Sequence, residues 1–124
     1  MHNKLIHVKN ITPLHVGSGR GAGDIDSEIM REKGTGWPVL PGSGVKGVLR
    51  AAALNGGMYE DSREFKGLFG MSGEEGSAGA LCCGDLRTLL FPVRSLHGGF
   101  AWTTCWTAIR RYNEIARACG ADEI

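Results

Sequence analysis

The chain has 124 residues, of which 42% are hydrophobic and 7% aromatic. This balance predicts a single globular domain over residues 1–124 and excludes an intrinsically disordered chain. The formal net charge of +1 excludes nucleic-acid binding driven by overall charge, so any such binding must depend on local clusters of cations. Twenty glycines, about twice the usual ~7% usage, predict long glycine-rich loops.

The sequence also indicates a cellular compartment. No apolar run approaches the length of a membrane span, and the first residues do not lead into a signal-peptide core, so we expect a cytoplasmic protein with no membrane partner. The cysteines match no Cys-x-x-Cys spacing, which favours reduced, buried thiols over a zinc or redox site. These thiols belong to Cys82, Cys83, Cys105 and Cys119.

The first predicted strand covers residues 4–14, where apolar side chains alternate loosely with polar ones. Four glycines in residues 17–23 then interrupt regular structure and give a backbone that a ligand can approach closely. Asp24, Asp26 and Glu28 follow this loop. Three acids at this spacing suit a divalent cation or a general base, and the alternative is an exposed acidic turn.

Residues 31–33 are expected to form a solvated charged turn that leads into an extended segment. Pro38 and Pro41 each hold the preceding residue in the extended region, so residues 37–40 are expected to form a strand or ledge.

A helix is predicted after Pro41, with Ser43 as its N-cap and residues 55–57 as its stop signal. Four apolar residues at helical spacing are expected to form its buried stripe: Val45, Val48, Leu49 and Ala52.

The start of this helix is a candidate phosphate site. Gly42, Ser43 and Gly44 place amide groups at the positive end of the helix dipole, with Lys46 one turn in and Arg50 one turn further. The alternative is an ordinary capped helix whose glycines only form the turn.

Residues 61–70 predict a short helix with Phe65, Leu68 and Phe69 directed inward. The Gly/Ser/Glu-rich residues 71–78 that follow predict a flexible loop.

A long strand is expected over residues 80–91, with a bulge at Gly84 and a bend or end at Pro92. It should pair with a strand over residues 100–105 as a hairpin joined by residues 94–99.

Helical spacing over residues 107–119 predicts a last helix that ends at Gly120. The order strand, helix, two strands, helix indicates an α+β fold. A ferredoxin-like βαββαβ core needs one more strand, so this core is expected to be incomplete.

The sequence resembles the RAMP superfamily of CRISPR proteins, and most closely the repeated backbone subunit of the type III Cmr effector complex. Matching motifs occur in the family's order in residues 12–19, 25–26, 31–32, 35–43, 46–50, 84–87, 91–96 and 100–102. Together they correspond to the N-terminal part of the family's usual length.

The resemblance implies an RRM-like ferredoxin core and copies that stack as a filament along a CRISPR guide RNA, beside other type III Cmr subunits. It also implies cleavage of paired target RNA with a divalent cation such as Mg²⁺. Asp26 matches the catalytic and metal-binding aspartate, and Asp24 is its competitor. The implied RNA-binding residues are Gly17, Ser18, Gly19, Gly42, Ser43, Gly44, Lys46, Arg50 and Arg94.

Two other functions stay open at this point. The chain is either a non-catalytic RNA-binding module or truncated remnant, with Asp26 idle, or a nuclease that processes CRISPR transcripts. The second requires His7, His15 or His97 as general base, although histidines in such segments more commonly serve packing.

Overall fold

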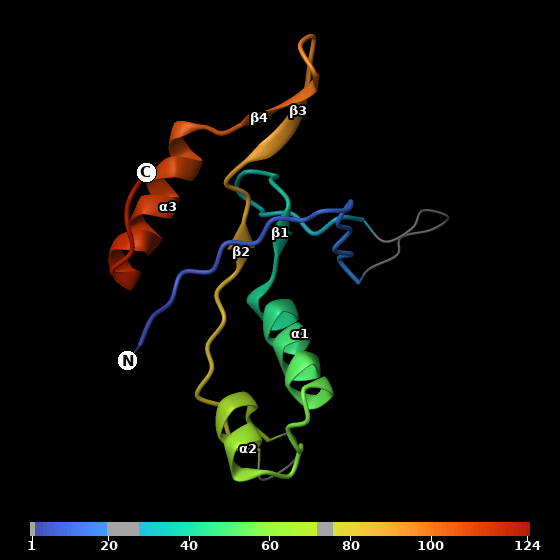
Figure 1. Ribbon diagram of the computed structural model, residues 1–124, viewed down its shortest axis with the longest axis vertical. Coiled ribbons are helices and arrows are strands. Elements are labelled where there is room, and N and C mark those ends of the chain that lie inside the picture. Colours follow the sequence, from blue (N-terminus) through green and yellow to red (C-terminus); the bar gives the residue numbers. More distant parts are fainter. Residues whose placement is uncertain (1, 20–27, 72–75) are drawn as a thin grey trace. The chain divides into compact units, whose positions relative to one another are not determined.

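The computed structural model describes residues 2–19, 28–71 and 76–124, which form an α+β protein with three helices and two two-stranded sheets (Figure 1). The helices are α1 (Gly42–Asn55), α2 (Arg63–Phe69) and α3 (Trp106–Cys119). The strands are β1 (Val39–Leu40), paired with β2 (Leu86–Arg87), and β3 (Phe91–Ser95), paired with β4 (Gly99–Thr103).

The chain divides into two compact units. One consists of Val16–Leu86, and the other of Met1–His15 together with Arg87–Ile124. The α+β class is confirmed, whereas a single domain and a ferredoxin-like core stay predictions.

Met30 lies at the centre of the extended structure in the Val16–Leu86 unit. Its amide donates to the carbonyl oxygen of Val16 at 2.7 Å, and its own carbonyl accepts from the amide of Val39 at 3.1 Å. Antiparallel bridges lie on either side, Gly17 with Ile29 and Arg31 with Pro38. The chain therefore enters and leaves residues 20–27 through paired backbone.

Side chains organise the turn between Glu32 and Trp37. The Thr35 hydroxyl donates to the Glu32 carboxylate at 2.6 Å, and the Arg31 guanidinium donates to the Gly36 carbonyl at 2.8 Å. The predicted charged turn is present, with Arg31 and Lys33 exposed, and Arg31 and Glu32 also fix backbone or side-chain groups of this turn.

Helix α1 begins two residues before the predicted first helical residue and ends in the predicted stop segment, and its cap differs from the prediction. Pro41, with φ −60° and ψ 142°, is the N-cap, and no side chain of that residue caps the helix. Ser43 lies inside the first turn. The N-cap prediction was wrong because proline's fixed φ already suits the residue that leads into a helix.

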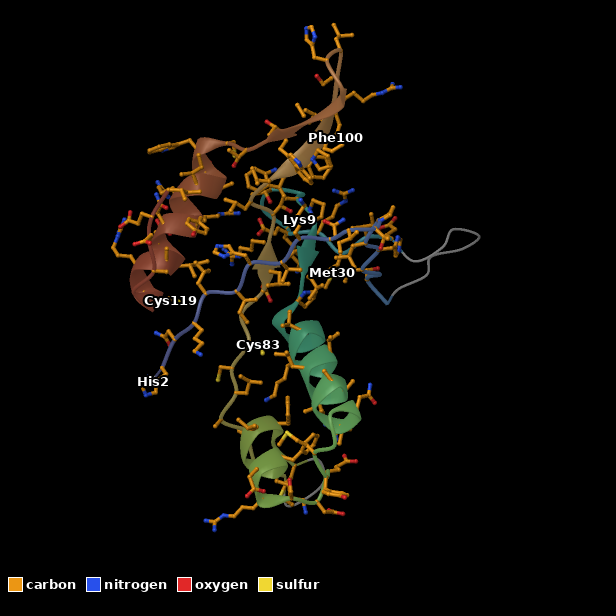
Figure 2. The ribbon with its side chains drawn as sticks, in the orientation of Figure 1. His2, Lys9, Met30, Cys83, Phe100 and Cys119 are labelled. Atoms are coloured by element: carbon orange, nitrogen blue, oxygen red, sulfur yellow. The ribbon has the colours of Figure 1, made fainter. Side chains whose placement is uncertain are left out.

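The predicted buried stripe of α1 was also wrong. Val48 is 69% exposed, Leu49 and Ala52 are exposed, and the buried residue of this helix is Gly42. A Cβ atom on Gly42 would lie 2.1 Å from the carbonyl oxygen of Cys83, which Figure 2 labels beside the start of α1. In the Val16–Leu86 unit this helix is therefore most tightly packed at its first residue, while the face that carries Val45, Lys46, Arg50, Ala53 and Leu54 is half-buried.

Helix α2 anchors its part of the chain through Phe65, which is 1% exposed and lies 4.9 Å from the Phe69 ring. The Ser62 hydroxyl caps the helix by accepting from the Phe65 amide at 3.2 Å. Leu68 is 42% exposed, so its predicted inward position was wrong.

Residues 80–91 do not form the predicted long strand. The amides of Ala80 and Leu81 instead donate to the carbonyls of Gly67 and Leu68, at 2.8 and 3.0 Å, and strand geometry begins only at β2. The backbone groups required for a strand ladder are thus used at the C-terminal end of α2. The predicted bulge at Gly84 does not arise.

A hairpin forms as predicted, but its first strand is β3 rather than residues 80–91, with Phe91 opposite Thr103 and Ser95 opposite Gly99. Pro92 lies inside β3 opposite Trp102 rather than ending the strand. Proline fits there because β3 pairs with one neighbour in the described part of the chain, which leaves one edge without ladder bonds.

The predicted strand over residues 4–14 was wrong, since these residues have no strand geometry. Side-chain contacts hold the segment instead. The Asn3 amide donates to the Ala118 carbonyl at 3.2 Å, and the His7 ring stacks on Tyr112 with centroids 5.5 Å apart. Ile11 is 97% exposed, as expected for a segment without a sheet partner.

Helix α3 confirms the predicted last helix, and Gly120 ends it with φ 66°. The chain then folds back along the helix. The Asn113 side chain exchanges two 2.9 Å hydrogen bonds with the backbone of Ile124, and Arg117 forms a two-pronged ion pair with Glu123.

All four cysteines are free, in agreement with the prediction, but Cys82 and Cys105 are exposed rather than buried. Within the described residues, no helix combines the length and apolar character needed to cross a membrane.

Because Gly42 packs directly against the backbone of Cys83, we expect a methyl group added at Gly42 to destabilise the fold strongly. We expect Gly42→Ala to lower the free energy of unfolding by about 2 kcal/mol, because backbone must move to admit the Cβ atom. Gly47→Ala, in the same helix with nothing within 4 Å of its Cβ position, should raise it by about 0.5–1 kcal/mol. Urea denaturation of both variants checks the pair, and equal effects would contradict the packing.

The Arg117–Glu123 pair predicts an acid-sensitive C-terminal segment. The hydrogen bonds from Arg117 lower the pKa of Glu123 below its ordinary value of 4.5. Because the folded pKa is depressed, the pairing is complete above that ordinary value and is lost as pH falls through the lowered pKa. An NMR titration of the Glu123 carboxyl carbon should show the lowered midpoint, which Arg117→Gln abolishes and Arg110→Gln preserves.

Candidate functional site

An open hollow of about 570 Å³ lies within the Val16–Leu86 unit and has Lys46 and Arg50 of α1 on its border. Apolar side chains contribute much of the remaining lining, together with the hydroxyl-bearing Ser77 and the thiol-bearing Cys82. The apolar members are Phe69, Met71, Ala78 and Leu81. Two cations together with these apolar side chains suit a ligand that has an anionic group and an apolar part.

Lys46 is the cation that remains available in this hollow. Its ammonium group has no ion-pair partner in residues 2–19, 28–71 and 76–124, and its side chain is half-buried. Lys46 is therefore the cation of α1 that an anion can bind without displacing a carboxylate of the described residues.

Arg50 is held by two neighbours. Its guanidinium pairs with the Glu60 carboxylate and lies over the Phe65 ring, 5.2 Å from the centroid. Both members of the ion pair are exposed, so the pair adds little stability. A phosphate can therefore compete with Glu60 for a guanidinium whose orientation is already set.

Three amides at the start of α1, those of Gly42, Gly44 and Val45, already have partners. The Gly42 amide donates to Oδ1 of Asp85 at 2.8 Å, and the Gly44 and Val45 amides donate to the Pro41 carbonyl at 2.9 and 3.2 Å. Sequence reasoning did not identify Asp85 as part of this site. No local pattern reports it, because 43 residues separate it from Gly42.

Part of the lining of the hollow comes from residues 70–71 and 77–79, whose backbones pair with each other. Gly70 and Ala78 form an antiparallel bridge, and the Met71 amide donates to the Ser77 carbonyl at 2.9 Å. A Cβ atom on Gly70 would lie 2.6 Å from the Ser77 carbonyl oxygen, and one on Gly79 would lie 2.3 Å from that of Leu68. Only glycine fits at both positions without backbone movement.

The glycine segment before residues 20–27 is described up to Gly19, which has φ 71°. The Ser18 amide donates to the Glu28 carbonyl at 2.8 Å, next to the Gly17–Ile29 bridge. These contacts fix the base of the loop that is expected to carry catalysis.

Asp24 and Asp26 themselves lie outside the described residues. Within the residues that the structure describes, no group of three or more histidine, cysteine, aspartate or glutamate side chains could hold a metal ion. The catalytic and metal-binding roles of Asp26 therefore stay predictions, as does the competing role of Asp24.

The other predicted residues lie in the second unit. Arg94 is an exposed residue of β3, opposite Phe100. The His7 ring bonds the Tyr112 hydroxyl at 3.2 Å, and the His97 amide donates to the Ser95 hydroxyl at the hairpin turn. The contacts of His7 favour a packing role over that of a general base.

The chain belongs to the RAMP superfamily, because the model of that family matches residues 7–123. This confirms the resemblance drawn from the separated motifs.

A curated relative is the CRISPR system Cmr endoribonuclease Cmr4 of Pyrococcus furiosus, which is 36% identical over 118 residues. The match covers 94% of this chain and 40% of the relative, so the chain spans less than half of that protein's length.

Solved structures agree with this kinship. A crystal structure of oligomeric Cmr4 from P. furiosus is 34% identical, with a TM-score of 0.71, over 90% of this chain and 38% of that one. A structure of P. furiosus Cmr4 (Cas7) is also 34% identical, with a TM-score of 0.62, over 77% and 37%.

Proposed function

We propose that this chain is the RNA-backbone-binding part of a Cmr effector subunit and that Lys46 is its principal phosphate contact. The observation that carries the proposal is a half-buried lysine at the border of a hollow, without an anionic partner among the described residues. Arg50 supports it as a second, pre-oriented cation one turn along α1. Protein contacts of this kind grip the RNA backbone and leave base recognition to pairing with a guide.

The proposed assembly consists of several copies along a guide RNA, together with other type III Cmr subunits. We propose that each copy in this assembly forms a ferredoxin-like core. Exposed apolar side chains on the β3–β4 hairpin support association with other polypeptides, because monomers rarely expose such groups together. They include Phe91, Phe100 and Trp102, with the last two in edge-to-face contact at 5.5 Å. The related Cmr4 of P. furiosus has itself been solved in an oligomeric form.

We further propose that the assembled protein cleaves target RNA with Asp26. The carboxylate would take the proton of the ribose 2′-OH, whose oxygen attacks the adjacent phosphorus while the bond to the 5′-oxygen breaks and that oxygen gains a proton. The products are a 2′,3′-cyclic phosphate and a 5′-hydroxyl. In the alternative route, water is the nucleophile. A bound divalent cation such as Mg²⁺, which carboxylate oxygens suit, supplies stabilisation of the negative charge on the phosphate.

Binding is tested by Lys46→Gln in the full chain, with a fluorescent single-stranded RNA titrated over a range of salt concentrations. Loss of one phosphate contact should weaken binding and reduce the slope of log affinity against log salt by about 1. Lys33→Gln, which removes an equal charge from an exposed turn, should leave the slope unchanged. Equal effects of the two substitutions would contradict a site at Lys46.

Cleavage is tested by Asp26→Ala in a complex reconstituted with a guide RNA and the other Cmr subunits. We expect target cleavage to fall by at least ~100-fold, while guide binding is kept, because a positioned general base contributes about 10²–10⁴-fold. Loss in Asp24→Ala instead would assign the chemistry to Asp24. A target with a 2′-deoxy nucleotide at the cleaved position separates the two nucleophiles, since it blocks only the 2′-OH route.

A further inference from the structure

The start of α1 depends on a carboxylate from a distant part of the sequence. Asp85 Oδ1 accepts a hydrogen bond from the Gly42 amide at 2.8 Å, and the bond is partly buried. Both residues belong to the Val16–Leu86 unit. A carboxylate at this place satisfies the first backbone donor of the helix and opposes the positive end of its dipole.

The helix lacks a local substitute for this group. Its N-cap is Pro41, whose side chain makes no capping hydrogen bond, and its first turn contains no acidic residue. In most helices a serine, threonine, aspartate or asparagine at the N-cap performs this task. Here Asp85 combines the functions of cap and first-turn acid.

Packing fixes the carboxylate at the helix end. Gly42 lies against the two residues that precede Asp85 in the chain. A Cβ atom on Gly42 would approach the Cys83 carbonyl oxygen to 2.1 Å and the Gly84 carbonyl carbon to 3.0 Å. Residues 83–85 therefore form a backbone support beneath the first turn of α1. This support keeps the Asp85 backbone next to the start of α1, within reach of the Gly42 amide.

We infer that Asp85 is a positioning residue that occupies the N-terminal end of α1 and thereby directs an RNA phosphate away from the first amide and toward Lys46. The inference rests on the proposed RNA-binding function. Its physical basis is that one negative charge already uses the donor and the dipole that a phosphate would otherwise share. Lys46, one turn further along, lies on the border of the hollow without an anionic partner among the described residues.

The cap is tested first, without RNA, by hydrogen exchange of the Gly42 amide in the full chain. Asp85→Asn keeps an oxygen acceptor in the same place, so protection of the amide should persist. Asp85→Ala removes the acceptor, so protection should be lost and the melting temperature should fall by several degrees. Unchanged protection in Asp85→Ala would overturn the assigned cap.

The charge is tested by titration of the same fluorescent single-stranded RNA. Asp85→Asn should tighten binding by about two- to five-fold at low salt, which corresponds to the usual strength of one charge at a helix end, and the gain should vanish at high salt. Lys46→Gln should weaken binding less in the Asp85→Asn background than in the unmodified chain, because the neutral cap no longer opposes the positive end of the helix dipole or repels a phosphate near it. Asp122→Asn removes an equal charge from the other unit and should produce neither effect.

Two results would overturn the inference while leaving the proposed RNA binding intact: unchanged or weaker binding in Asp85→Asn with an intact cap, or an equal loss from Lys46→Gln in both backgrounds. Absence of RNA binding by the unmodified chain would instead refute the proposed function. The exchange experiment on Gly42 would still decide whether Asp85 caps α1.

Discussion

The close approach of Gly42 to the backbone of residues 83–85 is the constraint on which the Val16–Leu86 unit most depends. It fixes where α1 begins, because there is no space for a side chain at its first residue. It also brings the carboxylate of Asp85 to the first amide of the helix. The position of Lys46 follows from this start, since a helix that begins elsewhere presents a different residue one turn later.

The parts of the fold that could be predicted from sequence are those with local causes. The two long helices have glycine at their C-terminal ends and periodic apolar residues, and the β3–β4 hairpin has two glycines with positive φ at its turn. The strands expected over residues 4–14 and 80–91 failed for the opposite reason. A strand requires a neighbour, and hydrophobic alternation does not report that Ala80 and Leu81 bond to the end of α2 or that His7 stacks on Tyr112.

In the candidate site, too, the residues set by local spacing could be predicted and the contacts between distant residues could not. Lys46 and Arg50 could be predicted because helical spacing sets them one turn apart, and the hollow has both on its border. The carboxylates that lie beside Arg50 and at the start of α1 could not be predicted. Glu60 reaches Arg50 through a turn of irregular backbone, and Asp85 reaches Gly42 across 43 residues, so neither contact leaves a pattern in the sequence.

The glycine wall of the hollow has a consequence for how such a surface evolves. Because Gly70 and Gly79 meet neighbouring main chain directly, the spacing there is determined by bond lengths and van der Waals radii rather than by rotamers. Mutation elsewhere in the hollow can change its polarity without changing this dimension. The main-chain contacts of Gly70 and Gly79 thus keep the width of the hollow constant there, while the side chains around them can change during evolution.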